Sequence, residues 1–172
     1  MNKLSLQFLF ISGIFFSCLS GCNSNQQKEA ENISEEKNIE TDEHFSQLDT
    51  LEIVLNSNDK MQFDKDEIIV WEDQTIILTL NHTGTMPKKS MGHNFVLIDN
   101  NISIADYAKL AMKAETNDYI PDKEKHTLAY TDLIGGGEST TITFESPEAG
   151  NYDFVCSFPG HYSIMKGKFI VK

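Results

Sequence analysis

The chain has no arginine, and all 14 of its basic residues are lysines. Against 26 acidic residues they leave a formal net charge of -12 and a pI near 4.7. Binding to nucleic acid depends on a positive field along the phosphate backbone, which this composition does not provide. An electrostatic attachment to anionic lipid is excluded for the same reason.

Cysteine is also scarce, at three residues in 172: Cys18, Cys22 and Cys156. The first two fall in an N-terminal stretch with the features of a processed segment, so the mature domain keeps one thiol and has no internal disulfide. A free thiol in an exported protein is open to oxidation unless it is buried or bound to metal. Cys156 is therefore either a metal ligand or a small buried core residue.

Long hydrophobic runs are confined to the N-terminus, where Leu4–Leu19 follows Lys3. This run is shorter than the roughly 20 residues of a membrane-spanning helix and is interrupted by polar residues. We interpret residues 1–21 as a lipoprotein signal peptide, since Leu19-Ser20-Gly21-Cys22 resembles the bacterial lipobox. The prediction is cleavage before Cys22, a lipid such as palmitate on its thiol, and an anchor on the periplasmic face of the cell envelope. An ordinary cleaved signal or an uncleaved anchor is the alternative.

Residues 22–50 are polar, with eight acidic residues between positions 23 and 50 against Lys28 and Lys37. Such a segment buries too little apolar surface to offset the entropy of ordering it. We expect an extended, self-repelling tether. His44 lies within it and is expected to be solvated.

The pattern changes at Leu51, where short runs of β-branched and aromatic residues begin to alternate with turn residues. One stretch, from Ile102 to about Asn117, has the composition and spacing of a helix. The predicted fold of residues 51–172 is all-β: an antiparallel sandwich or closed barrel of about eight strands, with Greek-key connections and one inserted helix. The expected strands lie at 51–55, 62–64 together with 67–70, 74–81, 95–98, 127–130, 139–144, 152–156 and 168–172.

The stretch from Cys156 to Met165 carries a thiol, an imidazole (His161) and a thioether between two expected strands. Pro159-Gly160 gives it a tight turn. These donors are too soft for calcium or magnesium, and methionine is a poor zinc ligand. They suit copper, whose electron-transfer sites use two histidines, one cysteine and a weak axial methionine. The loop supplies one imidazole, so a second must come from elsewhere.

His93 is the strongest candidate for that second imidazole, in the segment Met91-Gly92-His93-Asn94 before an apolar strand. Gly92 allows a close backbone approach, and Asn94 can link two loops by hydrogen bonds. A structural histidine at the start of a strand is the alternative reading. His82 and His126 are the remaining histidines of the domain, and His126 is expected at the surface.

Together these segments resemble the azurins, a family of blue-copper cupredoxins. The similarity runs from about Leu51 to Lys172 and rests on Met61-Gln62-Phe63, Leu80-Asn81-His82, Met86-Pro87-Lys88, Met91-Gly92-His93-Asn94, Tyr119-Ile120-Pro121-Asp122, Leu133–Glu138, Cys156–His161 and Met165-Lys166-Gly167.

The resemblance implies one type 1 copper ion with three strong ligands, His93, Cys156 and His161. It also implies weak axial contacts from the Met165 sulfur and the Gly92 carbonyl. By the same resemblance, Asn94 braces the Cys156 loop and the Phe158 N–H points at the sulfur.

Two positions depart from the azurin pattern. The family's disulfide is missing, since its positions are occupied by Leu51 and Asp73, and Phe95 stands where a tryptophan is frequent. Neither change affects a predicted ligand. His82 matches a family histidine that couples protonation to redox state, and a hydrogen-bonded core histidine is the equal alternative.

The implied function is transfer of single electrons, without enzymatic activity. The expected partners are redox proteins, such as c-type cytochromes or copper enzymes, docking on an apolar patch around His161. Its members are Met61, Met86, Met91, Phe158, Pro159 and Ile164. A copper chaperone or storage protein is the rival hypothesis, and a Cys-His nucleophile is a second one.

Overall fold

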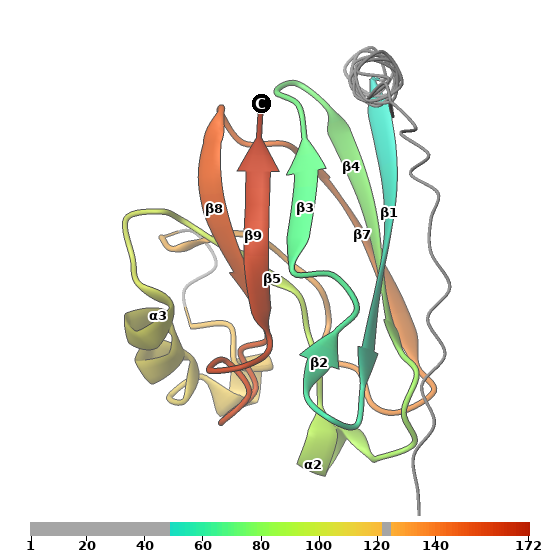
Figure 1. Cartoon of the computed structure of the whole chain (residues 1–172). Coiled ribbons are helices and arrows are strands. Elements are labelled where there is room, and N and C mark those ends of the chain that lie inside the picture. The colour runs from blue at the N-terminus through green and yellow to red at the C-terminus, as the bar shows by residue number, and fades with distance from the viewer. Residues whose placement is uncertain (1–48, 122–124) are drawn as a thin grey trace, which may run out of the picture. The chain divides into compact units, whose positions relative to one another are not determined.

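A computed structural model describes residues 49–121 and 125–172 (Figure 1). The predicted signal peptide, the lipidated Cys22, His44 and nearly all of the tether lie outside these described residues. No helix within the described ranges is long and apolar enough to cross a membrane.

The described residues form two β-sheets that face each other (Figure 1). The first has four strands in the order β2-β1-β4-β7: Gln62–Phe63, Thr50–Asn58, Thr75–His82 and Ser139–Glu145. The second has five strands in the order β3-β9-β8-β5-β6: Glu67–Val70, Lys166–Val171, Gly150–Val155, Val96–Ile98 and Thr127–Tyr130. The predicted all-β sandwich is confirmed. The two parts of the second expected strand region, 62–64 and 67–70, correspond to β2 and β3.

The sequence had suggested an antiparallel sandwich, but two of the strand pairs are parallel. Strand β1 pairs with β4 in parallel, with Leu55 opposite Leu80, and β3 pairs with β9 in parallel. The reason is the path between β1 and β4. Strand β3 crosses to the second sheet, so the chain re-enters the first sheet at the end where β1 began.

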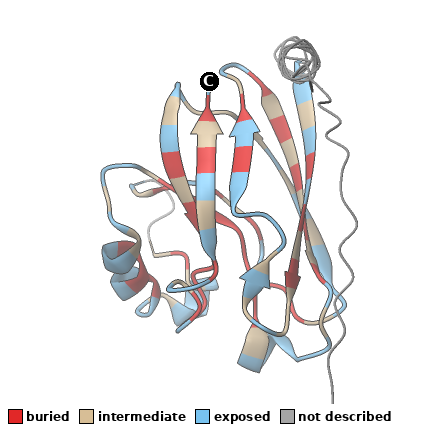
Figure 2. Cartoon of the chain, viewed as in Figure 1, coloured by how far each residue is buried: buried red, intermediate tan, exposed pale blue. Residues whose placement is uncertain are grey.

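The core between the sheets follows the two-residue period of the strands. Along β4, Ile76, Leu78 and Leu80 are fully buried, while the residues between them are partly exposed (Figure 2). His82 is the next member of this inward series and is also buried. The opposite sheet contributes the buried rings of Phe154 and Phe169 to the same cluster. The strand pattern therefore places a histidine at one end of an apolar core.

The helical region differs from the prediction of one helix over 102–117. Helix α3 covers Ile104–Ala111 and begins at Ser103, whose side chain accepts a hydrogen bond from the Asp106 N–H. Ala114 then leaves the helical region, and a separate 3₁₀ turn covers Glu115–Asn117. A short helix that was not predicted, α2, covers Lys88–Met91.

Leu51 lies in β1, and Asp73 adopts a left-handed turn conformation before β4. The strand ladder holds these two regions together, because Leu51 pairs with Ile76 and the Thr75 N–H bonds the Asp49 carbonyl at 2.8 Å. Backbone pairing thus connects the regions that a disulfide joins in the azurin pattern.

Candidate metal centre

The loop between β8 and β9 brings Cys156 and Met165 together. These strands pair antiparallel with Val155 opposite Lys166, so the residues just beyond them face each other. The Cys156 N–H donates to the Met165 carbonyl at 2.9 Å, and the Met165 N–H donates to the His161 carbonyl at 2.8 Å. Both side chains are fully buried, in a cluster with Leu133 and Phe158.

His161 turns back toward Cys156 within this loop. Its Nδ1 lies 3.6 Å from the Cys156 Sγ. Gly160 makes the turn with φ of 85°, a conformation that glycine adopts at little cost. The His161 ring is buried and contacts the Phe158 ring, with centroids 4.8 Å apart. The Cys156 thiol and the His161 imidazole therefore lie next to each other inside the loop.

His93 approaches the same place from the segment before β5. A pair of backbone hydrogen bonds with Ile134 holds it, at 2.8 and 2.9 Å. Its ring lies 5.1 Å from the His161 ring, centroid to centroid. The side chain is completely buried, and neither Nδ1 nor Nε2 has a hydrogen-bond partner.

Two unpaired ring nitrogens in one buried imidazole are costly unless a ligand satisfies them. Across residues 49–121 and 125–172, no three His, Cys, Asp or Glu side chains form a compact metal cluster by themselves. The centre predicted from the sequence adds the Met165 thioether and a backbone carbonyl to His93, Cys156 and His161. This donor set fits copper.

The backbone carbonyl comes from Gly92, whose oxygen lies 3.8 Å from the Cys156 Sγ. A side chain at this position has no room, because a Cβ would lie 2.7 Å from the Lys88 carbonyl oxygen and 3.0 Å from the Leu133 side chain. The glycine thus permits the close approach that the sequence suggested.

Asn94 links the two halves of the centre, as predicted. Its Oδ1 accepts a hydrogen bond from the Ser157 N–H at 2.9 Å, and its Nδ2 donates to the Ser157 Oγ at 2.9 Å. Both residues are buried. Sequence reasoning did not single out Ser157, although its place directly after Cys156 in the loop was a usable signal.

Burial controls the protonation of all three candidate ligands. It raises the pKa of Cys156 to about 12, against the opposing effect of hydrogen bonds from the backbone N–H groups of Asn94 and Phe158. Burial lowers the pKa of His93 to about 3, helped by charge repulsion from His82 and His161. Burial also lowers the pKa of His161 to about 4, helped by charge repulsion from His82. At neutral pH both imidazoles are therefore neutral and can donate a lone pair, while the thiol must lose its proton to bind a cation.

His82 lies beside the centre, but both of its ring nitrogens have hydrogen-bond partners and neither is free to bind a metal. Its ring stacks on His93, with centroids 4.2 Å apart and 4° between the planes. Its Nδ1 accepts from the Gly84 N–H at 3.0 Å, and its Nε2 lies 3.1 Å from the Met91 carbonyl oxygen. Of the two roles predicted for His82, these contacts match the hydrogen-bonded core histidine.

The predicted docking patch is only partly exposed. Met86 (37%) and Ile164 (59%) are open to solvent, and Pro159 is exposed as well. Phe158 is buried at 8%, contrary to its expected place on the surface. The reason is its packing: Tyr119, in a left-handed conformation with φ of 63°, lays its ring edge against the Phe158 ring.

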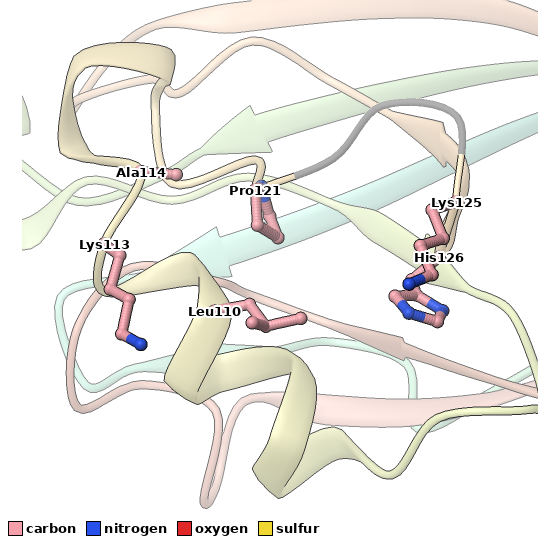
Figure 3. Close-up of a pocket in the computed structure, with 6 residues that line it drawn as sticks. All are labelled: Leu110, Lys113, Ala114, Pro121, Lys125 and His126. Carbon is pink, nitrogen blue, oxygen red and sulfur yellow. The ribbon is translucent and has the colours of Figure 1, made fainter.

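His126 takes no part in the centre. It lines a separate pocket of about 320 Å³ (Figure 3). The other lining residues are Leu110, Lys113, Ala114, Pro121 and Lys125. None of these was predicted as a ligand, so the pocket is distinct from the candidate metal centre.

Comparison with known proteins agrees with this architecture. The family described as copper binding proteins, plastocyanin/azurin family, matches residues 50–172. Azurin of Alcaligenes faecalis is 41% identical over 123 residues, covering 67% of this chain and 94% of that protein. Outer membrane protein H.8 of Neisseria gonorrhoeae is 39% identical over 117 residues, covering 66% of this chain and 63% of that protein.

Solved structures show the same fold. Auracyanin A, a "blue" copper protein of Chloroflexus aurantiacus, superposes with a TM-score of 0.65 at 29% identity, covering 72% of this chain and 99% of that one. An azurin of Methylomonas sp. strain J gives a TM-score of 0.64 at 32% identity, covering 70% and 97%. The cupredoxin fold predicted from the sequence is confirmed. The chain belongs to the plastocyanin/azurin family of copper-binding proteins.

Proposed function

We propose that His93, Cys156 and His161 hold the single type 1 copper ion of this blue-copper electron-transfer protein. In this proposal the Met165 sulfur and the Gly92 carbonyl are weak axial contacts. The observation that carries the assignment is the His93 imidazole, buried with both ring nitrogens unpaired beside the Cys156–His161 pair. When bound, copper supplies a one-electron Cu(I)/Cu(II) couple.

The protein's contribution is a site that resists rearrangement. The buried Asn94–Ser157 hydrogen bonds fix the loop after Cys156, and the His93–Ile134 bridge fixes the opposite wall. Because the candidate ligands are buried, we favour a fixed redox centre over a chaperone or storage site that hands its ion to a partner. The full burial of the Cys156 thiol likewise favours an electron carrier over a Cys-His enzyme.

Electrons would enter and leave beside His161, where its loop reaches the surface. We propose that redox proteins, such as c-type cytochromes or copper enzymes, dock on the apolar patch. Its exposed members are Met86, Pro159 and Ile164, and Met61 and Met91 are half-buried beside them. A small apolar contact suits brief encounters.

We further propose that a lipid on Cys22 anchors the protein at the periplasmic face of the bacterial cell envelope. The carrier domain would then move on the acidic segment 23–50. Similarity to a protein named outer membrane protein H.8 supports a place in the envelope.

The test is copper titration of residues 23–172 followed by voltammetry. The proposal expects an intense blue absorption band that saturates at one copper per chain and a reversible one-electron couple. A colourless complex or an irreversible couple contradicts it. His93→Gly is the sharpest variant, because it removes the unpaired imidazole and should weaken copper binding.

A further inference from the structure

Asp59 stands in the tight turn between β1 and β2, outside the predicted ligand set. We propose that it is a positioning residue for the metal centre, one that fixes the loop 83–87 and the His82 ring that stacks on His93. This inference rests on the proposed function in one respect, the role of His93 as a ligand.

The Asp59 carboxylate holds the loop 83–87 in place, because it accepts hydrogen bonds from backbone N–H groups of that loop. The Thr85 N–H donates to Oδ2 at 2.8 Å, and the Met86 N–H donates to Oδ1 at 3.1 Å. The Thr85 hydroxyl adds a longer contact of 3.4 Å to Oδ2. The hydrogen bond from the Thr85 backbone is the main cause that lowers the pKa of Asp59, so the group stays ionised at neutral pH.

Gly84 shows how closely the loop wraps this carboxylate. A Cβ at Gly84 would lie 2.1 Å from the Asp59 Oδ1 and 2.3 Å from its Cγ. Such distances are far below van der Waals contact. The glycine and the carboxylate therefore depend on each other, and a side chain at position 84 displaces Asp59.

The same loop determines how His82 is held. Because the Gly84 N–H donates to the His82 Nδ1, the ring proton is assigned to Nε2. That Nε2 lies 3.1 Å from the Met91 carbonyl oxygen and 3.8 Å from the Asp59 Oδ1. The His82 ring is thus fixed at both nitrogens while its face lies against His93. Asp59 acts on the candidate ligand through this stack.

Asp59 also joins two segments of the docking patch. It lies two residues before Met61, which adopts a left-handed conformation with φ of 57°. Its hydrogen bond to the Met86 N–H ties this hairpin turn to the segment leading into α2. Figure 1 shows the β1–β2 turn and α2 at the same end of the two sheets. One carboxylate therefore connects the two segments that carry Met61 and Met86.

The experiment compares Asp59→Ala with Asp59→Asn in the full chain. Asparagine removes the charge but keeps one acceptor oxygen, so the difference between the two variants isolates positioning from charge. Asp64→Asn is the matched control, because this carboxylate of the same hairpin bonds only Asn56 and Lys65 among the described residues. Gly84→Ala is a second route to displacing the carboxylate if Asp59→Ala does not fold.

The first readout is amide hydrogen exchange of copper-free protein. We expect the Thr85 and Met86 amides to exchange at least tenfold faster in Asp59→Ala and Gly84→Ala, and at an intermediate rate in Asp59→Asn. The second readout is the reduction potential of the copper-loaded protein, which should differ between Asp59→Ala and Asp59→Asn. Wild-type exchange rates, or one shared potential for the two variants, would overturn the inference. If the wild type binds no copper, the proposed function fails while the exchange result still decides whether Asp59 orders the loop.

Discussion

The imidazole rings of His82 and His93 lie parallel, 4.2 Å apart, although one ends β4 of the first sheet and the other precedes β5 of the second. The two rings differ in their hydrogen bonding, and this difference assigns them different roles. Both nitrogens of His82 face backbone groups, whereas neither nitrogen of His93 has a partner. One ring of the stack is therefore available to a metal and the other supports it.

His82→Phe keeps an aromatic ring against His93 and removes both hydrogen bonds. We expect the blue band and the copper stoichiometry to persist. The free energy of unfolding should fall by about 1–3 kcal/mol, because the Gly84 N–H and the Met91 carbonyl lose a buried partner. Denaturant unfolding and copper titration measure the two effects. Loss of copper from this variant would make His82 a ligand and contradict the assignment.

Asn94→Ala should destabilise the copper-free protein by about 1–3 kcal/mol, since it leaves the buried Ser157 N–H without an acceptor. Urea unfolding gives the value. Asn101→Ala is the control: its side chain is exposed and bonds only Asp99 among the described residues, so a change within about 0.5 kcal/mol is expected. Equal effects of the two substitutions would show that Asn94 does not brace the loop.

Tyr107 makes stability depend on alkaline pH. Burial raises its pKa from 10.0 to about 12, and its hydroxyl bonds the Thr127 Oγ1 at 2.7 Å. Since the folded pKa lies above the unfolded one, this stabilisation is fully present below pH 10 and is lost as pH rises toward 12. A shift of this size corresponds to about 2–3 kcal/mol.

In copper-free protein, Tyr107→Phe should therefore show a smaller fall in unfolding free energy than the wild type between pH 10 and pH 12. Urea unfolding at a series of pH values measures the two slopes. Tyr162→Phe, which leaves the Tyr107–Thr127 pair intact, is the control. Identical slopes for wild type and Tyr107→Phe would refute the role of Tyr107.

Lys88 and Lys89 are exposed on α2 beside the docking patch. Among the described lysines, ion pairs join Lys65, Lys109 and Lys168 to aspartates, while Lys88 and Lys89 have no such pair. In a chain of net charge -12 they provide local positive charge, which would attract an anionic reactant.

The double variant Lys88→Gln/Lys89→Gln should slow electron exchange with the anion hexacyanoferrate several-fold at low salt. The difference should shrink at 0.5 M salt through screening. Stopped-flow absorbance measures the rates, and Lys65→Gln should behave like the wild type. A salt-independent effect would point to a change at the centre instead.

Much of this architecture could be predicted from the chain. The alternating pattern of Thr75–His82 indicates a half-buried strand, and the same period places His82 inside. The Cys156–Met165 loop was recognisable because its donors lie within ten residues. The prediction of His93 as a ligand rested on Gly92 and Asn94, since the need for a close approach and a link between loops is visible in residue type.

Other features depend on contacts between segments far apart in the chain. The parallel pairing of β1 with β4 follows from β3 crossing to the other sheet, which no local pattern encodes. The burial of Phe158 depends on Tyr119, 39 positions earlier, in a conformation unusual for a non-glycine residue. Asp59 looks like an ordinary turn residue until the loop 83–87 folds over it.

The most direct test of the central claim is the visible spectrum of Cys156→Ser after copper titration, beside wild type and Met165→Leu. Serine keeps the size of the side chain and removes the thiolate, so the intense blue band should vanish. Met165→Leu fills the same buried space, and it should keep the band and the copper while changing the reduction potential. A Cys156→Ser protein that remains blue would show that copper is bound elsewhere and would contradict the account.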